Sequence, residues 1–452
     1  MILGPTCSIA DRIAFLNDTA VFTTGSGLQY GDVYRIPVPG GDVHVVTDPD
    51  LAEDILIRHG DCFEKSRIYW RELYRIVGPA LGSVEGERWD YLHQLQQPFF
   101  TPRNVKRYLP AAQEITTAHL QRLAGETGEG RTVSVLDALS RMNVHVLLHV
   151  LFGADEALPY GEIAERIGDG EAIIAWRSKF PWRPATAWLT GANQRARGHK
   201  AFFDGIATQL QSARPDGATA DAHAEASTLI DALVNVAADD RAPAFPDNVV
   251  RNEIIVHLGA GTETHTVAEG WTLYLLWRHP EVLERVRDEV RDVAGSAPVS
   301  PEHLDALIYT RQVLRESLRL YPPSYGLVRD CVRPTELRGC RIRPGQTFFI
   351  SLCGLHRSPR LWDEPERFLP ARFAPALAHS IGKYQYMPFG AGKHVCIGQH
   401  LAVPCMLLAL GQFVQRFEWE FDESDAAFVG LSTMKPAGPF TARLTPRAQV
   451  LA

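Results

Sequence analysis

The spacing of apolar residues predicts helices over most of the chain. Apolar side chains recur at intervals of three and four residues, typical of a half-buried helix, in 86–97, 108–124, 137–152, 193–212, 248–278 and 280–293. Near the N-terminus, "DVYRIPVPGGDVHVVTD" (32–48) alternates around a Gly-Gly pair, which predicts a β-hairpin. Residues 49–60 should then form a helix that ends at Gly60.

The C-terminal part of the chain follows a different pattern. Residues 326–351 are strand-like, whereas 356–390 are rich in Pro, Arg and Phe and show little periodicity, so we expect ordered coil there. A last helix should cover 397–416, with a bend or local break at Pro404.

No linker, repeat or change of composition divides the chain. Only "ARPDGATADAHAEAS" (213–227) is weakly patterned, and we expect it to be a mobile surface loop. The sequence therefore predicts one domain over 1–452, mostly α, with a minor β region drawn from about 30–48 and 326–351.

Composition narrows the class of protein. The chain has 452 residues, 45% of them hydrophobic, and a formal net charge of −7, which argues against nucleic-acid binding because that needs a concentrated basic face. Its seven cysteines form no CxxC pair, which favours a reducing compartment and gives no zinc signature. The longest apolar run, "LAVPCMLLAL", is about half of the roughly 20 residues of a spanning helix. We expect a cytoplasmic protein without a membrane span or signal peptide.

The segment "PFGAGKHVCIG" (388–398) carries the strongest chemical signal. Cys396 stands just before the last predicted helix, where unpaired N–H groups favour a thiolate, and glycines allow a flat group to approach the backbone. A lone cysteine is more often a buried structural thiol, but the residues around Cys396 favour a functional role. The segment resembles the haem-binding loop of the cytochrome P450 superfamily, and the matching residues are Phe389, Gly392, His394, Cys396 and Gly398.

This resemblance implies the haem b cofactor and a single-domain P450 fold, with haem between the long central helix and the helix after the Cys loop. Cys396 is the expected iron ligand. The other expected haem contacts of this loop are Phe389, Gly390, His394 and Gly398.

Two more stretches resemble P450 motifs that are structural. "ESLR" (316–319) looks like the Glu-x-x-Arg helix, in which Glu316 and Arg319 lie one turn apart. "EPERFLPARF" (364–373) looks like the segment whose arginine completes an ionic cluster with that pair. The register favours Arg372 over Arg367. We expect this cluster to hold the coil that leads to Cys396.

"AGTETH" (260–265) resembles the oxygen-activating part of the P450 central helix. Ala260 is an expected haem contact, Thr264 is expected to orient a water molecule, and Glu263 to relay protons. A mid-helix threonine can also simply bond back to a carbonyl one turn earlier. His265 departs from the pattern. Both His265 and His257 either have structural partners or add a titratable group to the pocket.

"GERWDYLHQLQQPFF" (86–100) resembles the helix that holds a haem propionate. Trp89 matches the pattern, His93 stands where an arginine is usual, and Arg329 lies where the family often has another propionate-binding arginine. By the same analogy, 66–84, 170–184, 256–268, 324–328 and 431–434 should line the substrate pocket. Four of their side chains should make it apolar and aromatic, namely Trp70, Trp176, Tyr325 and Met434.

The resemblance implies a monooxygenase that oxidises, in the first instance hydroxylates, a small and largely apolar molecule, with a role in secondary metabolism. Because no flavin or iron–sulfur motif is present, electrons should come from a ferredoxin and its reductase, with Lys393 either contacting them or merely solvated. Two alternatives stay open. One is a haem-thiolate enzyme of rearrangement or group transfer without dioxygen, and the other is a non-enzymatic haem sensor.

Overall fold

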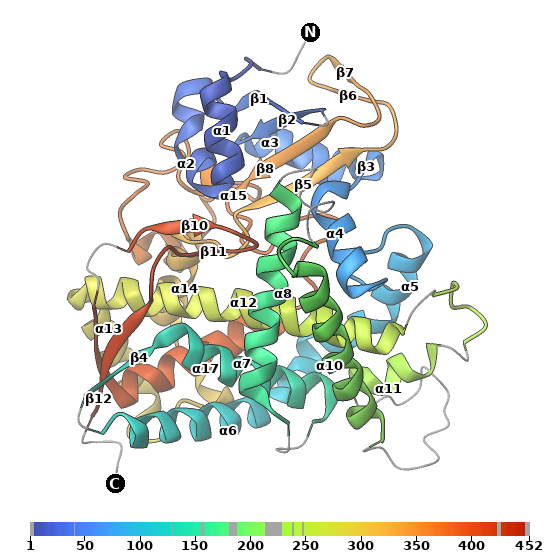
Figure 1. Ribbon diagram of the computed structural model, residues 1–452. Helices are drawn as coiled ribbons and strands as arrows, with labels where there is room; N and C mark the ends of the chain where they lie inside the picture. The colour runs from blue at the N-terminus through green and yellow to red at the C-terminus, as the bar shows by residue number, and fades with distance from the viewer. Residues whose placement is uncertain are drawn as a thin grey trace.

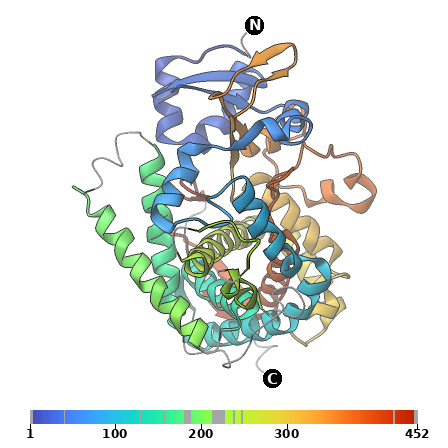
Figure 2. The same ribbon diagram turned by 90° about the vertical axis from the view of Figure 1, so that its right-hand side faces the viewer.

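The long helix α12 (Val249–Arg278) forms the centre of the molecule, and Figure 2 shows it nearly end-on with other helices around it. The computed structural model describes residues 4–39, 41–128, 130–154, 158–179, 188–212, 228–236, 239–245, 248–422 and 426–447. Residues 213–227 lie outside these ranges, so the loop expected there stays a prediction.

Helices make up most of the described chain (Figure 1). Those other than α12 are α1 (Ile9–Asn17), α2 (Thr19–Tyr30), α3 (Pro49–Glu53), α4 (Arg67–Val77), α5 (Glu87–Gln96), α6 (Pro102–Glu126), α7 (Val135–Phe152), α8 (Tyr160–Lys179), α10 (Ala192–Ser212), α11 (Leu229–Val234), α13 (Pro280–Ala294), α14 (Ile308–Leu320), α15 (Leu352–His356), α16 (Pro375–Ala378) and α17 (Gln399–Arg416). All six helices predicted from apolar spacing between 86 and 293 are confirmed, with ends shifted by a few residues.

Helix α12 packs against α7, α8, α10, α14 and α17, so it is buried on nearly every side. A peripheral helix such as α13 buries one stripe, Val282, Val286 and Val290, at four-residue spacing. Helix α7 has the length and hydropathy of a membrane span, but 61% of it is buried inside the molecule, as in a core helix. A cytoplasmic location stays a prediction.

The main sheet joins the two ends of the sequence, as predicted. Its strand order is β1-β2-β8-β5-β3, with β2 and β8 parallel and the other pairs antiparallel. The strands are β1 (Val33–Val38), β2 (Gly41–Val46), β3 (Phe63–Lys65), β5 (Gly326–Cys331) and β8 (Thr347–Ser351). Strand β8 lies in the middle of the sheet, and four of its five residues are buried.

Three smaller sheets complete the β structure, in the orders β4-β12-β9, β10-β11 and β6-β7. Their strands are β4 (Arg131–Ser134), β6 (Thr335–Leu337), β7 (Cys340–Ile342), β9 (Phe417–Phe421), β10 (Phe428–Gly430), β11 (Met434–Pro436) and β12 (Thr441–Pro446). Strand β9 alternates strictly between buried and exposed residues. The sequence analysis did not find β4, β9, β10, β11 or β12.

One local prediction needs correction and another is made more specific. The helix expected to end at Gly60 is α3 followed by a π-helical turn, Asp54–Arg58, and the chain then tightens into a 3₁₀ turn at Gly60–Cys62. At Pro404 the helix itself is not interrupted: α17 continues through the proline, and the expected break is confined to the hydrogen-bond ladder. Pro404 lies in the second turn, so only one hydrogen bond of the ladder is lost near a helix end.

A buried ionic cluster fixes the coil that leads to Cys396. Arg319 binds both oxygens of Glu316, Nε to Oε2 at 2.7 Å and Nη2 to Oε1 at 2.8 Å, and neither side chain is exposed. Arg372 Nε adds a bond of 3.3 Å to Glu316 Oε1. The predicted three-residue cluster is therefore confirmed, and Arg367 instead pairs with Glu364 at the surface.

The same cluster holds the main chain of residues 356–390. Arg319 donates to three carbonyl oxygens, those of His356 and Pro365 at 2.7 Å each and that of Arg367 at 3.1 Å. The Leu369 N–H donates to Glu316 Oε1 at 2.9 Å. Side chains thus replace the missing backbone ladders, as expected for ordered coil.

We expect Glu316→Ala to lower the free energy of unfolding by about 3–5 kcal/mol, because it leaves the Arg319 guanidinium buried without its counter-charge. That is a large part of the roughly 5–15 kcal/mol that stabilises a domain. Urea unfolding of the purified protein measures it, with Arg367→Ala as the control at an exposed pair. Equal midpoints for the two variants would show that the cluster is not structural.

Candidate active site

A cavity of about 1340 Å³ lies between α12 and the loop 388–398. On its α12 wall, Ala260 is exposed although it lies in the middle of the central helix. On the opposite wall the side chain of Cys396 is exposed, yet it lies deep inside the molecule. These surfaces face the cavity and not the outer solvent, so the helix and the cysteine loop form two facing walls of one chamber.

Glycines shape the loop that presents Cys396. Gly390 and Gly392 have φ values of 74° and 77°, which side chains disfavour. A Cβ at Gly392 would also lie 2.2 Å from the Leu56 carbonyl oxygen. The Cys396 N–H donates to the Phe389 carbonyl at 2.9 Å, which closes the loop. The loop therefore needs glycine for its backbone path as well as for close approach to the cavity.

The start of α17 directs backbone dipoles at the cysteine sulfur. Burial raises the pKa of the Cys396 thiol, whereas hydrogen bonds from the backbone N–H groups of Gly398 and Gln399 lower it. Those donors favour a thiolate, and so would a bound cation at the sulfur. The predicted thiolate chemistry thus has a structural basis, although desolvation opposes it in the free thiol.

Two buried cations lie on the cavity wall near the cysteine loop. Arg329 is 7% exposed, and Nη1 donates to the Val328 carbonyl at 3.0 Å; burial lowers its pKa to about 10. Lys65 is 8% exposed, and Nζ donates to the carbonyls of Leu81 and Gly82 at 3.0 and 3.2 Å. Burial lowers the pKa of Lys65 to about 8.

An aromatic stack borders these cations. The rings of Trp89 and His93 stack at 4.5 Å, and His394 contacts Trp89 edge-on at 4.7 Å. His394 Nε2 lies 3.2 Å from a Glu85 carboxylate oxygen. Burial lowers the pKa of His93, so its imidazole is predominantly neutral at pH 7 and can give a hydrogen bond but little charge.

The predicted proton-relay residues do not contact each other. Thr264 Oγ1 donates to the Ala260 carbonyl at 2.7 Å, the local bond expected of a mid-helix threonine. Glu263 turns away and accepts from Thr433 Oγ1 at 3.0 Å and from the ammonium of Lys435. Both residues still line the cavity, so Thr264 retains lone pairs that can accept from a water molecule.

Both unusual histidines of α12 have structural partners. His257 Nδ1 lies 2.9 Å from the Glu253 carbonyl, its ring stacks on Phe100, and burial lowers its pKa to about 4. His265 lies 2.9 Å from the Gly261 carbonyl and 3.3 Å from the Ala402 carbonyl, which ties α12 to α17. Both rings also border the cavity, and His257 Nε2 is buried without a partner among the described residues, so a role of either histidine in the pocket stays a prediction.

The predicted pocket walls are largely confirmed. Segments 66–84, 256–268 and 324–328 contribute to the lining, including Trp70 and Tyr325. Two of the four side chains predicted to line the cavity, Trp176 and Met434, do not line it. Trp176 packs instead against Ile173 and Ala192. Residues 180–184 lie outside the described part of the chain.

Met434 was also wrongly placed in the lining. It is fully buried against Ala20 and Cys353, behind the cavity wall that Thr433 and its two preceding residues form. The sequence could not show this, because neighbouring residues of a strand point to opposite faces.

Lys393 is half-exposed and ion-paired, and its contact with an electron carrier stays a prediction. Its Nζ lies 2.9 Å from an Asp90 carboxylate oxygen and 4.7 Å from the centre of the Trp89 ring. The lysine therefore joins the cysteine loop to α5.

Comparison with known proteins decides the family. The Cytochrome P450 family model matches residues 26–434. The chain belongs to the cytochrome P450 family. It is 27% identical to mouse cytochrome P450 3A41 over 439 residues, which cover 94% of this chain and 86% of that protein. It is 28% identical to cyclooctat-9-en-7-ol 5-monooxygenase of Streptomyces melanosporofaciens, with 86% and 82% covered. Lithocholate 6-beta-hydroxylase of Mesocricetus auratus is 26% identical, with 93% and 86% covered.

P450 enzymes are oxidoreductases that bind haem, and the residues of this site fit that group. Cys396 faces the cavity and can bind iron, and the wall beside it holds Arg329 and Lys65, buried cations suited to the two haem carboxylates. His394 Nδ1 is buried and has no partner among the described residues. Sequence reasoning missed Lys65, because no spacing signal connects residue 65 with this wall.

Replacing Cys396 with serine should abolish thiolate ligation. We expect the reduced, carbon-monoxide-treated wild type to show the strongly red-shifted Soret band of a thiolate-bound haem, and Cys396→Ser to lose it. Cys405→Ser is the control, because that thiol lies nine residues further along in α17, where burial raises its pKa to about 12. If Cys405→Ser lost the red shift and Cys396→Ser kept it, the ligand assignment would be wrong.

Proposed function

We propose that this P450 hydroxylates a largely apolar molecule with dioxygen, and that it works in secondary metabolism. The observation that carries the proposal is the facing arrangement of Cys396 and the Ala260–Thr264 turn across one cavity. Haem bound through Cys396 supplies the activation of dioxygen. The chain's own residues then have two tasks, to hold the substrate and to deliver protons.

The cavity lining supports an apolar substrate. Side chains from α4, α8, α10 and α12 contribute its apolar surface, namely Trp70, Leu73, Ile76, Ile174, Phe203 and Val256. Burial of apolar surface yields about 25 cal/mol per Å², so a hydrocarbon skeleton would bind well here. The names of two relatives, acting on cyclooctat-9-en-7-ol and on lithocholate, favour a polycyclic skeleton of terpenoid or steroid size.

Proton delivery supports oxygenation over the alternatives. Thr264 borders the cavity and its hydroxyl can hold a water molecule, while Glu263 reaches both the cavity and, through Lys435, the molecular surface. A haem sensor needs neither group. An enzyme of rearrangement or group transfer without dioxygen could dispense with Thr264, which gives a direct test.

We expect Thr264→Ala to lower the product formed per reductant consumed by about tenfold, with the difference released as peroxide, because proton delivery loses its water-holding hydroxyl. The substrate is first found by haem spin-state change in a panel of terpenoids, steroids, polyketides and fatty acids. Thr264→Ser keeps a hydroxyl and should keep most of the coupling. Unchanged coupling in Thr264→Ala would favour the reaction without dioxygen.

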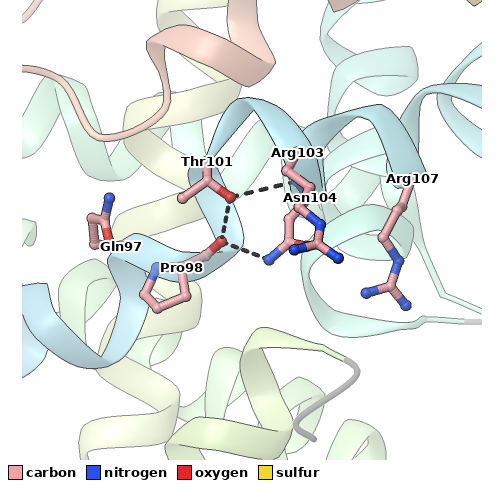
Figure 3. Close-up of a pocket in the computed structure, with 6 residues that line it drawn as sticks. All are labelled: Gln97, Pro98, Thr101, Arg103, Asn104 and Arg107. Atoms are coloured by element: carbon pink, nitrogen blue, oxygen red, sulfur yellow. Dashed lines mark hydrogen bonds between the residues drawn. The ribbon is translucent and has the colours of Figure 1, made fainter.

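We further propose that an acidic electron carrier, most simply a ferredoxin served by its reductase, docks beside the cysteine loop. The 3₁₀ turn Gln97–Phe100 and α6 both contact α17, whose N-terminus follows Cys396. Figure 3 shows Arg103 and Arg107 projecting from α6 around a surface pocket. Asn104 there is held by the Pro98 carbonyl at 2.8 Å, whereas neither arginine has a described partner. Such cations attract an acidic protein over a distance.

The double substitution Arg103→Glu, Arg107→Glu should slow reduction by ferredoxin about tenfold or more at low salt, through loss of steering. Arg341→Glu is the control, because β7 and α6 lie at opposite ends of the molecule (Figure 1). Stopped-flow reduction with ferredoxin and with dithionite separates docking from haem chemistry. Equal ferredoxin rates for both variants would place the donor elsewhere.

A further inference from the structure

The acid of the central helix is held by a hairpin from the far end of the chain. Glu263 Oε1 accepts from Thr433 Oγ1 at 3.0 Å across 170 residues of sequence, and the same oxygen binds the Lys435 ammonium. The Glu263 side chain is 11% exposed and that of Lys435 is 24% exposed, so the pair is largely shielded from water. A shielded ion pair holds its geometry better than a surface pair does.

Strand geometry explains why two donors reach one carboxylate. Thr433 and Lys435 are two residues apart where β11 begins, so they point to the same face of the strand, toward Glu263. Met434 points to the opposite face and is buried. Figure 1 shows β10 and β11 lying next to α12.

Strand β11 is fixed at its first residue, Met434, and the turn before it borders the cavity. Trp271 Nε1 donates to the Met434 carbonyl at 2.9 Å, and the Met434 N–H donates to the Pro323 carbonyl at 2.9 Å. The tip, residues 431–433, lines the cavity, and Leu431 at its end is 37% exposed. A molecule that fills the cavity therefore touches the turn that carries Thr433, one of the two residues that hold Glu263, while Met434 stays in place.

We propose that Lys435 and Thr433 are positioning residues that hold Glu263 away from Thr264 until substrate presses on the hairpin tip. Successive helix residues point about 100° apart, so the Glu263 carboxylate must rotate about its own side chain to approach Thr264. With both donors on Oε1, that rotation costs two hydrogen bonds, one of them charge-assisted. The hairpin thereby links cavity occupancy to proton delivery and suppresses reductant loss when no substrate is bound. This inference rests on the proposed relay role of Glu263.

Removing the cation should release the acid prematurely. We expect Lys435→Met to raise substrate-free reductant consumption by the holoenzyme about three- to tenfold, with peroxide as the product, while Lys435→Arg restores the wild-type rate. Adding Glu263→Gln to Lys435→Met should cancel the increase, because the released group is then no longer an acid. Arg341→Met is the control for loss of a surface cation. Wild-type reductant consumption in Lys435→Met, or an increase that survives Glu263→Gln, would overturn the proposal.

A second readout tests the contact without catalysis. A double-mutant cycle of Lys435→Met and Glu263→Gln in urea unfolding of the carbon-monoxide-bound holoprotein should show energetic coupling between the two residues. If the two residues are coupled in unfolding but Glu263→Gln leaves turnover unchanged, the contact exists and the relay role of Glu263 is refuted. Absence of coupling in unfolding would refute the positioning role itself, whatever the turnover.

Discussion

The buried pair of Glu316 and Arg319 is the constraint on which the site depends. Residues 356–390 have few backbone ladders of their own, so their carbonyl and N–H groups must find partners elsewhere. Arg319 supplies donors to three carbonyls and Glu316 accepts one backbone N–H. This coil runs directly into the loop of Cys396, and its path therefore sets where the thiol meets the cavity. Charges buried at this cost are tolerated because every polar atom of the pair is bonded.

The cavity then combines three environments on separate elements. The glycine loop and the first N–H groups of α17 surround the sulfur, buried Arg329 and Lys65 provide positive charge beside it, and α12 presents small residues and a hydroxyl opposite. One carboxylate, that of Glu85, lies 3.9 Å from Lys65 Nζ and is shared with His394, so it does not balance both buried cations. The two carboxylates of a bound haem would supply the negative charge that balances these side chains.

Much of this could be predicted from the sequence, for identifiable reasons. A helix with a single apolar stripe, such as α13, is predicted by the spacing of its apolar residues. The cysteine loop was identified by its resemblance to the P450 haem loop, and the structure shows why its path requires a glycine at Gly392. The contact of Glu316 with Arg319 was predictable because it is one helix turn long, whereas Arg372 was added by the family resemblance. Lys65 and Lys435 were not, because each gains its role from a tertiary contact that no local pattern encodes. Trp176 and Met434 were misplaced because which face of an element meets the cavity depends on packing and not on residue type.

The central claim is that Cys396, Thr264 and the apolar cavity together make a monooxygenase of this chain. Turnover under isotopically labelled dioxygen tests that claim most directly, once a compound that shifts the haem spin state is in hand. The account predicts a product that carries one labelled oxygen atom from dioxygen, with the second atom released as water. A product that carries no label, or oxygen taken from the solvent, would contradict the account and favour rearrangement or group transfer at the same haem.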